Sequence, residues 1–219
     1  MIRREVLLET LDSGLRECRG TLERTIGNAI TSVVWPPGGS DFTILAESGR
    51  GRVQGNGVGP IKREFVESIR NDGWLLEKSL RFADGNIIGR FDAVWPLPGT
   101  LFEPTGGRIL KVKSGSFAAV EWETGNISSS HRSLNRMALG LVHGGVAAAF
   151  LVLPTRKLYA YLTDRIGSFE ELAPYFGIYH NLKVSRGLLE VLAVEYDKLS
   201  SDASVVRRIP KGTDGRAAQ

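Results

Sequence analysis

Cysteine is almost absent from this chain of 219 residues, in which Cys18 is the only one. A single thiol excludes a framework of intrachain disulfides and a cysteine-rich zinc site. No apolar run approaches the roughly 20 residues that a membrane-spanning helix needs, and the early acidic residues Glu5, Glu9 and Asp12 do not fit a secretory signal. We therefore expect a cytoplasmic protein with no membrane partner.

The composition is that of a globular protein, with 42% apolar and 24% charged residues. The length fits one large domain or two small ones. Because the sequence has no internal repeat and no clear linker, we expect one mixed α/β domain over residues 1–219. The net charge of +4 and the pI of about 9.3 suit a polyanionic partner such as nucleic acid, although many soluble proteins carry such a charge by chance.

The spacing of apolar residues predicts helices that alternate with strands. Helices are expected over residues 3–30, 60–71, 129–143 and 169–176. Strands are expected over residues 42–45, 74–82, 87–95, 117–123, 146–153 and 187–196.

Several local signals refine these boundaries. Pro60 suits the first turn of a helix, and Ser128 or Ser129 suits the N-cap of the helix that follows the third long strand. Residues 96–116 are rich in Pro and Gly and indicate a long loop or an extended hairpin. The polar, basic tail over residues 204–219 is expected to be poorly ordered without a partner.

Three carboxylates form the most informative pattern. Asp92 interrupts an apolar strand, and Glu121 and Glu123 share one face of the next long strand, because side chains in a strand alternate. Clustered carboxylates repel one another unless a cation lies between them, and oxygen ligands favour Mg²⁺ or Mn²⁺. The alternative is a solvent-facing pair on an edge strand. The apolar surroundings and the basic helix that follows favour the metal site, at which water is activated next to a phosphate.

The helix after these acids carries a polar face made of His131, Arg132, Asn135 and Arg136. One interpretation is an ordinary solvated face. The other is that Arg132 reaches a guanine edge or a phosphate, while Asn126 or Ser128 at the helix entrance contacts other bases.

Long motifs carry a resemblance to a known family. They are EWETGNISSSHRSLNRMALGLVHG, YLTDRIGSFEELAPYF and IPKGTDG, with fainter matches at VVWPPGGSDFTI, NGVGPIK and the segment from Trp74 to Lys78. Over roughly residues 30–216 the chain resembles the BamHI-like family of type II restriction endonucleases. The resemblance implies an α/β restriction-endonuclease-like core with a central mixed β-sheet flanked by helices. It also implies a homodimer that cuts both strands of a palindrome in double-stranded DNA.

The resemblance further implies a set of catalytic residues. The family's carboxylates fall on Glu77, Asp92, Glu121 and Glu123. The first three would bind Mg²⁺, with Mn²⁺ as a substitute and Ca²⁺ supporting binding without cleavage. Many relatives have lysine at the last position, and here Glu123 would act as the general base for a metal-activated water. The assignment of Glu77 depends on the resemblance alone.

The family's DNA-binding residues also have counterparts. They are Asn126, Ser128, Arg132, Asp164, Arg165, Lys62, Lys211 and Gly215. Without the resemblance, Asp164 and Arg165 would be read as a surface ion pair. Because this set is complete, the implied target is GGATCC, cut after the first G to leave 5′ overhangs.

The chain departs from the family pattern in three places. The segment between Asp92 and Glu121 is longer, and its extra length carries Arg108, Lys111 and Lys113. It is either a contact to the DNA backbone or an idle hairpin, and we favour the second. The C-terminal tail is shorter, with Arg216 in place of an apolar residue. The polar pairs of the family's dimer are not kept at Val142 and Gly177, so we expect apolar dimer contacts.

Two other functions remain open at this point. The first is a sequence-specific DNA-binding protein of the same fold that has lost cleavage or changed specificity. Retention of all four acids argues against it. The second is an α/β enzyme that does not act on nucleic acid. The stretch GRGRVQGNGVG has no strand leading directly into it and no closing Lys-Ser/Thr, so it does not support a phosphate-binding loop.

Overall fold

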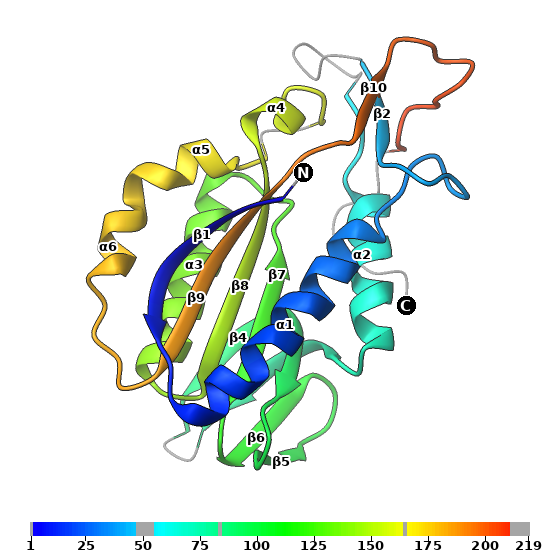
Figure 1. The fold of residues 1–219 in the computed structure, drawn as a ribbon. Helices are drawn as coiled ribbons and strands as arrows, with labels where there is room; N and C mark the ends of the chain where they lie inside the picture. Colours follow the sequence, from blue (N-terminus) through cyan, green and yellow to red (C-terminus); the bar gives the residue numbers. More distant parts are fainter. Residues whose placement is uncertain (1, 47–54, 83–84, 164–165, 211–219) are drawn as a thin grey trace.

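A mixed sheet of eight strands forms the centre of the molecule (Figure 1). The computed structural model describes residues 2–46, 55–82, 85–163 and 166–210. The strand order is β1-β9-β8-β7-β4-β3-β6-β5. The strands are β1 (Ile2–Thr10), β3 (Leu75–Arg81), β4 (Ile87–Pro96), β5 (Leu101–Pro104), β6 (Ile109–Ser114), β7 (Phe117–Trp122), β8 (Val146–Pro154) and β9 (Gly187–Val194).

The sheet contains both kinds of strand pairing. Strands β7, β8 and β9 are parallel neighbours, and β6 is parallel to β3. Strands β1, β4 and β5 pair antiparallel with their neighbours. Every residue of β8 and β9 is buried, as expected for parallel strands covered on both faces.

Helices cover both faces of this sheet (Figure 1). One face carries α1 (Ser13–Thr31) and α2 (Gly59–Asn71), and the other carries α3 (Ile127–Val142), α5 (Phe169–Leu172) and α6 (Phe176–His180). The remaining elements are α4 (Arg156–Tyr159), the 3-10 helix η1 (Ala173–Tyr175) and a parallel two-stranded sheet of β2 (Thr43–Leu45) and β10 (Lys198–Ser200). Within the described ranges, every helix is too short or too polar to traverse a lipid bilayer.

Each face of the sheet has its own apolar core. On β7, Ala118 and Val120 pack with α1 and α2, whereas Phe117 and Ala119 pack with α3. Phe65 of α2 is fully buried in the first core, where one such side chain stabilises the fold by about 1.5–3 kcal/mol. Because alternate residues of β7 enter opposite cores, the strand and the carboxylates at its end have a fixed register.

The structure confirms the predicted α/β class and the central mixed sheet flanked by helices, but two boundaries were wrong. Residues 3–30 were predicted as one helix; instead β1 comes first, and α1 begins after Asp12, whose Oδ1 accepts from the Leu15 N–H at 2.7 Å. The N-cap of α3 is Asn126 rather than Ser128 or Ser129, because its Oδ1 accepts from the Ser129 N–H at 3.1 Å.

The segment over residues 96–116 forms the extended hairpin that was one of the two predicted alternatives. Strands β5 and β6 pair with each other, and β6 joins the sheet next to β3. The tail differs from expectation in its first part, because Val206 and Ile209 are buried and the Ile209 N–H donates to Asn56 Oδ1 at 3.2 Å. Residues 211–219 lie outside the described residues.

Candidate active site

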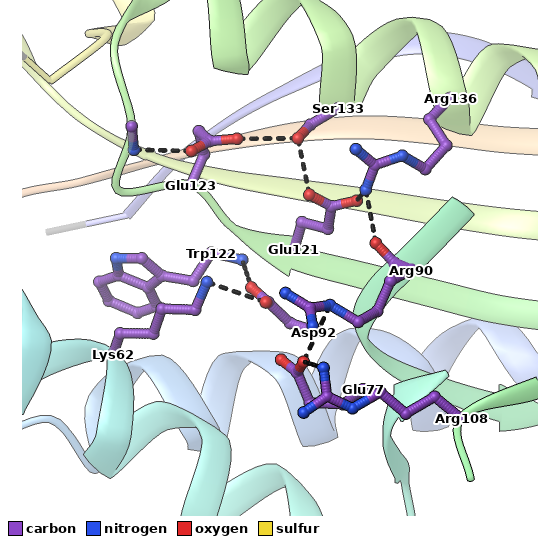
Figure 2. Close-up of polar contacts among 11 residues, drawn as sticks. Lys62, Glu77, Arg90, Asp92, Arg108, Glu121, Trp122, Glu123, Ser133 and Arg136 are labelled. Carbon is purple, nitrogen blue, oxygen red and sulfur yellow. Dashed lines mark hydrogen bonds and ion pairs between the residues drawn. The ribbon is translucent and has the colours of Figure 1, made fainter. Parts of the chain in front are cut away.

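Three neighbouring strands bring the predicted carboxylates to one part of the sheet (Figure 2). Strand β4 carries Asp92 and pairs with β3 on one side and β7 on the other. Strand β3 carries Glu77, β7 carries Glu121, and Glu123 follows directly after the last residue of β7. The sheet therefore places acids that are distant in sequence side by side.

Glu121 and Glu123 face α3 and share a single hydroxyl group (Figure 2). The Oγ of buried Ser133 lies 2.6 Å from Glu121 Oε2 and 2.8 Å from Glu123 Oε2. The Gly125 N–H donates to the other oxygen of Glu123 at 2.6 Å. A side chain at position 125 would collide with this carboxylate, because an added Cβ would lie 2.8 Å from Glu123 Oε1. These contacts hold the two carboxylates in defined orientations.

Glu121 is the most buried of the four acids, with 7% of its surface exposed. Burial raises the pKa of its carboxyl group from 4.5 to about 7, although Arg136 and Ser133 act to lower it. The charges of Asp92 and Glu123 raise the pKa of Glu121 further. These three carboxylates are therefore close enough to interact electrostatically.

Asp92 is held from the opposite side, by α2 and by the backbone of β7. Its Oδ1 lies 2.8 Å from the Lys62 ammonium group, and its Oδ2 accepts from the Trp122 N–H at 2.9 Å. Lys62 was predicted to contact DNA. In the structure it supplies the positive charge nearest to Asp92.

Glu77 has a different environment, with two guanidinium groups on one carboxylate oxygen. Arg90 lies 3.0 Å and Arg108 3.7 Å from Glu77 Oε2. The backbone of Glu77 has a φ of +55°, in the left-handed region that residues other than glycine rarely adopt. An irregularity in the β3–β4 pairing follows at Lys78 to Leu80.

The convergence of the four carboxylates on one ion stays a prediction. In the part of the chain that the structure describes, no three acidic, histidine or cysteine side chains are arranged to hold a metal ion. Each acid instead has a cation or hydroxyl partner, because like charges in close contact require compensation. The donor set still fits a hard divalent cation, since it consists of carboxylate oxygens on adjacent strands.

The structure describes four of the eight predicted DNA-binding residues. Asn126 and Ser128 are exposed at the start of α3, and Arg132 is exposed one turn later, where its guanidinium donates to Ser129 Oγ at 2.8 Å. Lys62 contacts Asp92, as described above. The other four, Asp164, Arg165, Lys211 and Gly215, lie outside the described residues.

Sequence reasoning missed the groups that hold the acids. Ser133 was not singled out, and Arg136 was placed only on the polar face of the helix, whereas its guanidinium contacts both Glu121 and the Arg90 carbonyl. A signal was present, because Ser133 and Arg136 are three residues apart and share a helix face with buried Met137. Asn135 also has a structural contact, since it accepts from the Tyr179 hydroxyl at 2.7 Å.

Comparisons with known proteins find similar chains. The family profile described as "Restriction endonuclease BamHI" matches residues 1–216. The type II restriction enzyme OkrAI of Oceanobacter kriegii is 38% identical over 192 residues, which cover 88% of this chain and 87% of OkrAI. The type II restriction enzyme BamHI of Bacillus amyloliquefaciens is 34% identical over 200 residues, which cover 87% of this chain and 79% of BamHI.

A solved structure shows the same fold at low sequence identity. The restriction endonuclease BglII in complex with a DNA 16-mer superimposes with a TM-score of 0.59 at 9% identity, covering 90% of this chain and 79% of that one.

Proposed function

Because the chain belongs to the BamHI family of type II restriction endonucleases, we propose that it hydrolyses double-stranded DNA at GGATCC, after the first G, leaving 5′ overhangs. The observation that carries this proposal is that the acids of the candidate active site lead directly into the helix that carries the predicted base-reading residues. Strand β7 leads into Glu121 and Glu123, and α3 begins four residues after Glu123, where Asn126 at the N-cap and Ser128 in the first turn have exposed side chains. Arg132 follows on the next turn, where its guanidinium can read guanine.

Restriction endonucleases of this kind are generally metal-dependent. We propose that Glu77, Asp92 and Glu121 hold Mg²⁺, with Mn²⁺ as a substitute and Ca²⁺ supporting binding alone. When bound, the cation supplies positive charge beside the scissile phosphate and lowers the pKa of water. Each of these three acids also forms an ion pair within the protein: Asp92 with Lys62, Glu77 with Arg90, and Glu121 with Arg136.

Glu123 is proposed as the general base. The Gly125 N–H and the Ser133 hydroxyl each occupy one of its oxygens and so fix the orientation of the carboxylate. A carboxylate oxygen has a second lone pair, which remains able to accept a proton from the attacking water. Glu123 is also less buried than Glu121, so water can reach it.

The set of DNA contacts is proposed to include residues beyond α3. They are Lys62, Asp164, Arg165, Lys211 and Gly215, in addition to Asn126, Ser128 and Arg132. Asp164 and Arg165 have the chemistry to read cytosine and guanine edges in the major groove.

We also propose that residues 1–219 form one endonuclease domain that works as a homodimer. Four large apolar side chains are exposed on α3, η1 and α6: Leu139, Val142, Tyr175 and Ile178. These elements adjoin one another, since the ring of Tyr175 lies 4.5 Å from that of His131 on α3. Exposed apolar side chains on adjoining elements support a contact with a second copy.

The dimer can be tested by measuring molar mass in solution. Replacing Ile178 with lysine is expected to shift the protein from dimer to monomer. Val205→Lys is the matched control. Val205 is also a β-branched apolar residue, its exposed fraction is 67% against 64% for Ile178, and it follows β10 rather than belonging to α3, η1 or α6. A monomeric wild type, or equal behaviour of both variants, would rule out this interface.

The cleavage proposal is tested by a digest of mapped plasmid DNA with Mg²⁺. Discrete fragments that all end at GGATCC are expected. Uncut DNA or random nicking would contradict the proposal.

A second candidate is a DNA-binding protein of this fold that does not cut. The observation that favours it is that every acid already has a cation or hydroxyl partner, with no group of three described acids arranged around an ion. Specific binding to GGATCC in Ca²⁺ without cleavage in either Mg²⁺ or Mn²⁺ would select this candidate.

A further inference from the structure

We propose that the β5–β6 hairpin is part of the active site. There, Arg108 binds a backbone phosphate of the DNA beside the acidic cluster, which consists of Glu77, Asp92, Glu121 and Glu123. The inference rests on the proposed action on double-stranded DNA. It assigns a function to the segment that the sequence alone favoured as an idle hairpin.

Backbone contacts fix the position of Arg108. Strand β6 pairs in parallel with the same strand that carries Glu77, with Ser79 opposite Ile109. The Ser79 N–H donates to the Arg108 carbonyl at 2.8 Å, and the Lys78 ammonium donates to the Gly107 carbonyl at 3.1 Å. Arg108 is therefore attached to the active-site strand rather than to a free loop.

The side chain of Arg108 points to Glu77 (Figure 2). Its guanidinium lies 3.7 Å from the carboxylate, yet 57% of the side chain is exposed. Arg90 is the nearer partner of Glu77, at 3.0 Å. Because Arg90 alone can compensate the charge of Glu77, Arg108 can turn to another anion without leaving that carboxylate unpaired.

The local charge balance favours a phosphate as that anion. Two guanidinium groups face one carboxylate, so this corner of the site carries an excess positive charge. A guanidinium has five N–H donors in a planar fork and binds phosphate oxygens through two of them at once. Each strand of DNA presents a phosphate at every nucleotide, and a strand cut next to Asp92 and Glu121 must pass this corner.

The hairpin also provides a matched control. Lys111 and Lys113 alternate with buried Leu110 and Val112, so they lie on the exposed face of β6. Lys113 pairs with Glu103 at 3.0 Å, whereas Arg108 pairs with Glu77. Arg108→Ala and Lys113→Ala therefore remove the same charge from one hairpin, but only the first removes it from the active site.

The experiment compares the wild type with R108A, R108K and K113A. Binding to a GGATCC duplex is measured in Ca²⁺ over a series of salt concentrations, and thermal unfolding confirms that each variant is folded. Loss of each phosphate contact reduces the slope of log K against log [salt] by about 0.9, and a dimer loses the contact in both subunits, so a reduction of about 1.8 is expected. We expect this change for R108A, a smaller change for R108K, and the wild-type slope for K113A.

Two results would overturn the inference alone. One is a wild-type slope for R108A while the wild type binds and cuts normally. The other is an equal loss for R108A and K113A, which would indicate a general basic surface. A wild type that neither binds nor cuts the duplex would instead overturn the proposed function, and the inference with it.

Discussion

The four acids of the candidate site fall into two pairs with opposite surroundings. Glu121 and Glu123 at the end of β7 share Ser133, a buried hydroxyl on α3, and Glu121 also pairs with Arg136. Glu77 and Asp92 on β3 and β4 are held mainly by long basic side chains, of which Arg90 is 49% exposed.

This difference separates a fixed part of the site from an adjustable one. A short serine side chain on a helix packed against the sheet has little freedom to move, so it determines where the Glu123 carboxylate lies. Lysine and arginine side chains have many rotamers and can leave a carboxylate when a stronger cation arrives. The fixed orientation of Glu123 suits its proposed role in proton transfer, which needs geometry. The exchangeable partners of Glu77 and Asp92 suit the proposed metal binding, to which Glu121 would add a ligand already held in place.

The largest expected effect is on the cleavage rate, when the proposed general base of the fixed pair, Glu123, is replaced. Glu123→Gln should lower the cleavage rate by about 10²–10⁴-fold, because the amide cannot accept the proton from water. Specific binding in Ca²⁺ should remain, as measured by gel shift on a GGATCC duplex. Glu77→Gln serves as the comparison and should lose less activity. Parallel loss of binding and cleavage in Glu123→Gln would indicate a structural role.

Ser133→Ala should have the next largest effect, on stability. It removes the donor that Glu121 and Glu123 share, and an unsatisfied buried polar group costs about 1–3 kcal/mol. Urea unfolding would measure the loss. Ser128→Ala on the exposed face of α3 is the control and should change stability by less than about 0.5 kcal/mol. If both variants were equally stable, the hydroxyl would not be what holds the pair.

Burial of Glu121 should also make stability depend on pH. The pKa of Glu121 is raised from 4.5 to about 7 by burial, so the folded protein holds this proton more tightly than the unfolded chain. The contribution of the Glu121 proton to the free energy of unfolding is complete below about pH 4.5. It is lost as the pH rises through about 7. Unfolding free energies in chelator at pH 5 and pH 8 should differ less for Glu121→Gln than for the wild type.

Glu190 on β9 contributes to the same pH dependence, because burial raises its pKa to about 7 as well. Glu190→Gln should therefore reduce the pH dependence separately from Glu121→Gln. A wild type that is equally stable at both pH values would contradict the assignment for both groups.

The smallest effect is expected at the adjustable pair. Arg90→Ala removes an ion pair between half-exposed side chains, which contributes about 0.2–1 kcal/mol. Its unfolding free energy should stay near that of the wild type. A loss as large as that of Ser133→Ala would remove the distinction between the two pairs.

Sequence patterns predicted most of the fold because most elements have a clear period. The apolar spacing of residues 60–71 and the apolar run at 146–153 correspond to α2 and β8. Strand β1 was missed for a physical reason. Its residues Val6, Leu7 and Leu8 are consecutive and do not alternate, since the pairing with β9 shifts register between Val6 and Leu8. Only a partner far along the chain makes this segment a strand.

The site shows the same division between local and distant information. Asp92, Glu121 and Glu123 could be predicted because acids inside or beside apolar strands are conspicuous. Arg90 and Arg108 could not, because their roles depend on the pairing of β3 with β4 and β6. An exposed arginine in a Gly-rich hairpin has no sequence pattern that identifies its partner.

Strand β1 pairs along its whole length with β9, so Ile2 lies opposite Val194 and Thr10 opposite Gly187. On a ribosome that adds about 5–20 residues per second, the first strand would wait roughly ten to thirty-five seconds for its partner to emerge. The sheet is completed only when synthesis has passed Val194, the last residue of β9. Nascent chains halted before residue 187 would thus be unable to form the native edge, which delays the appearance of a finished nuclease in the cell that makes it.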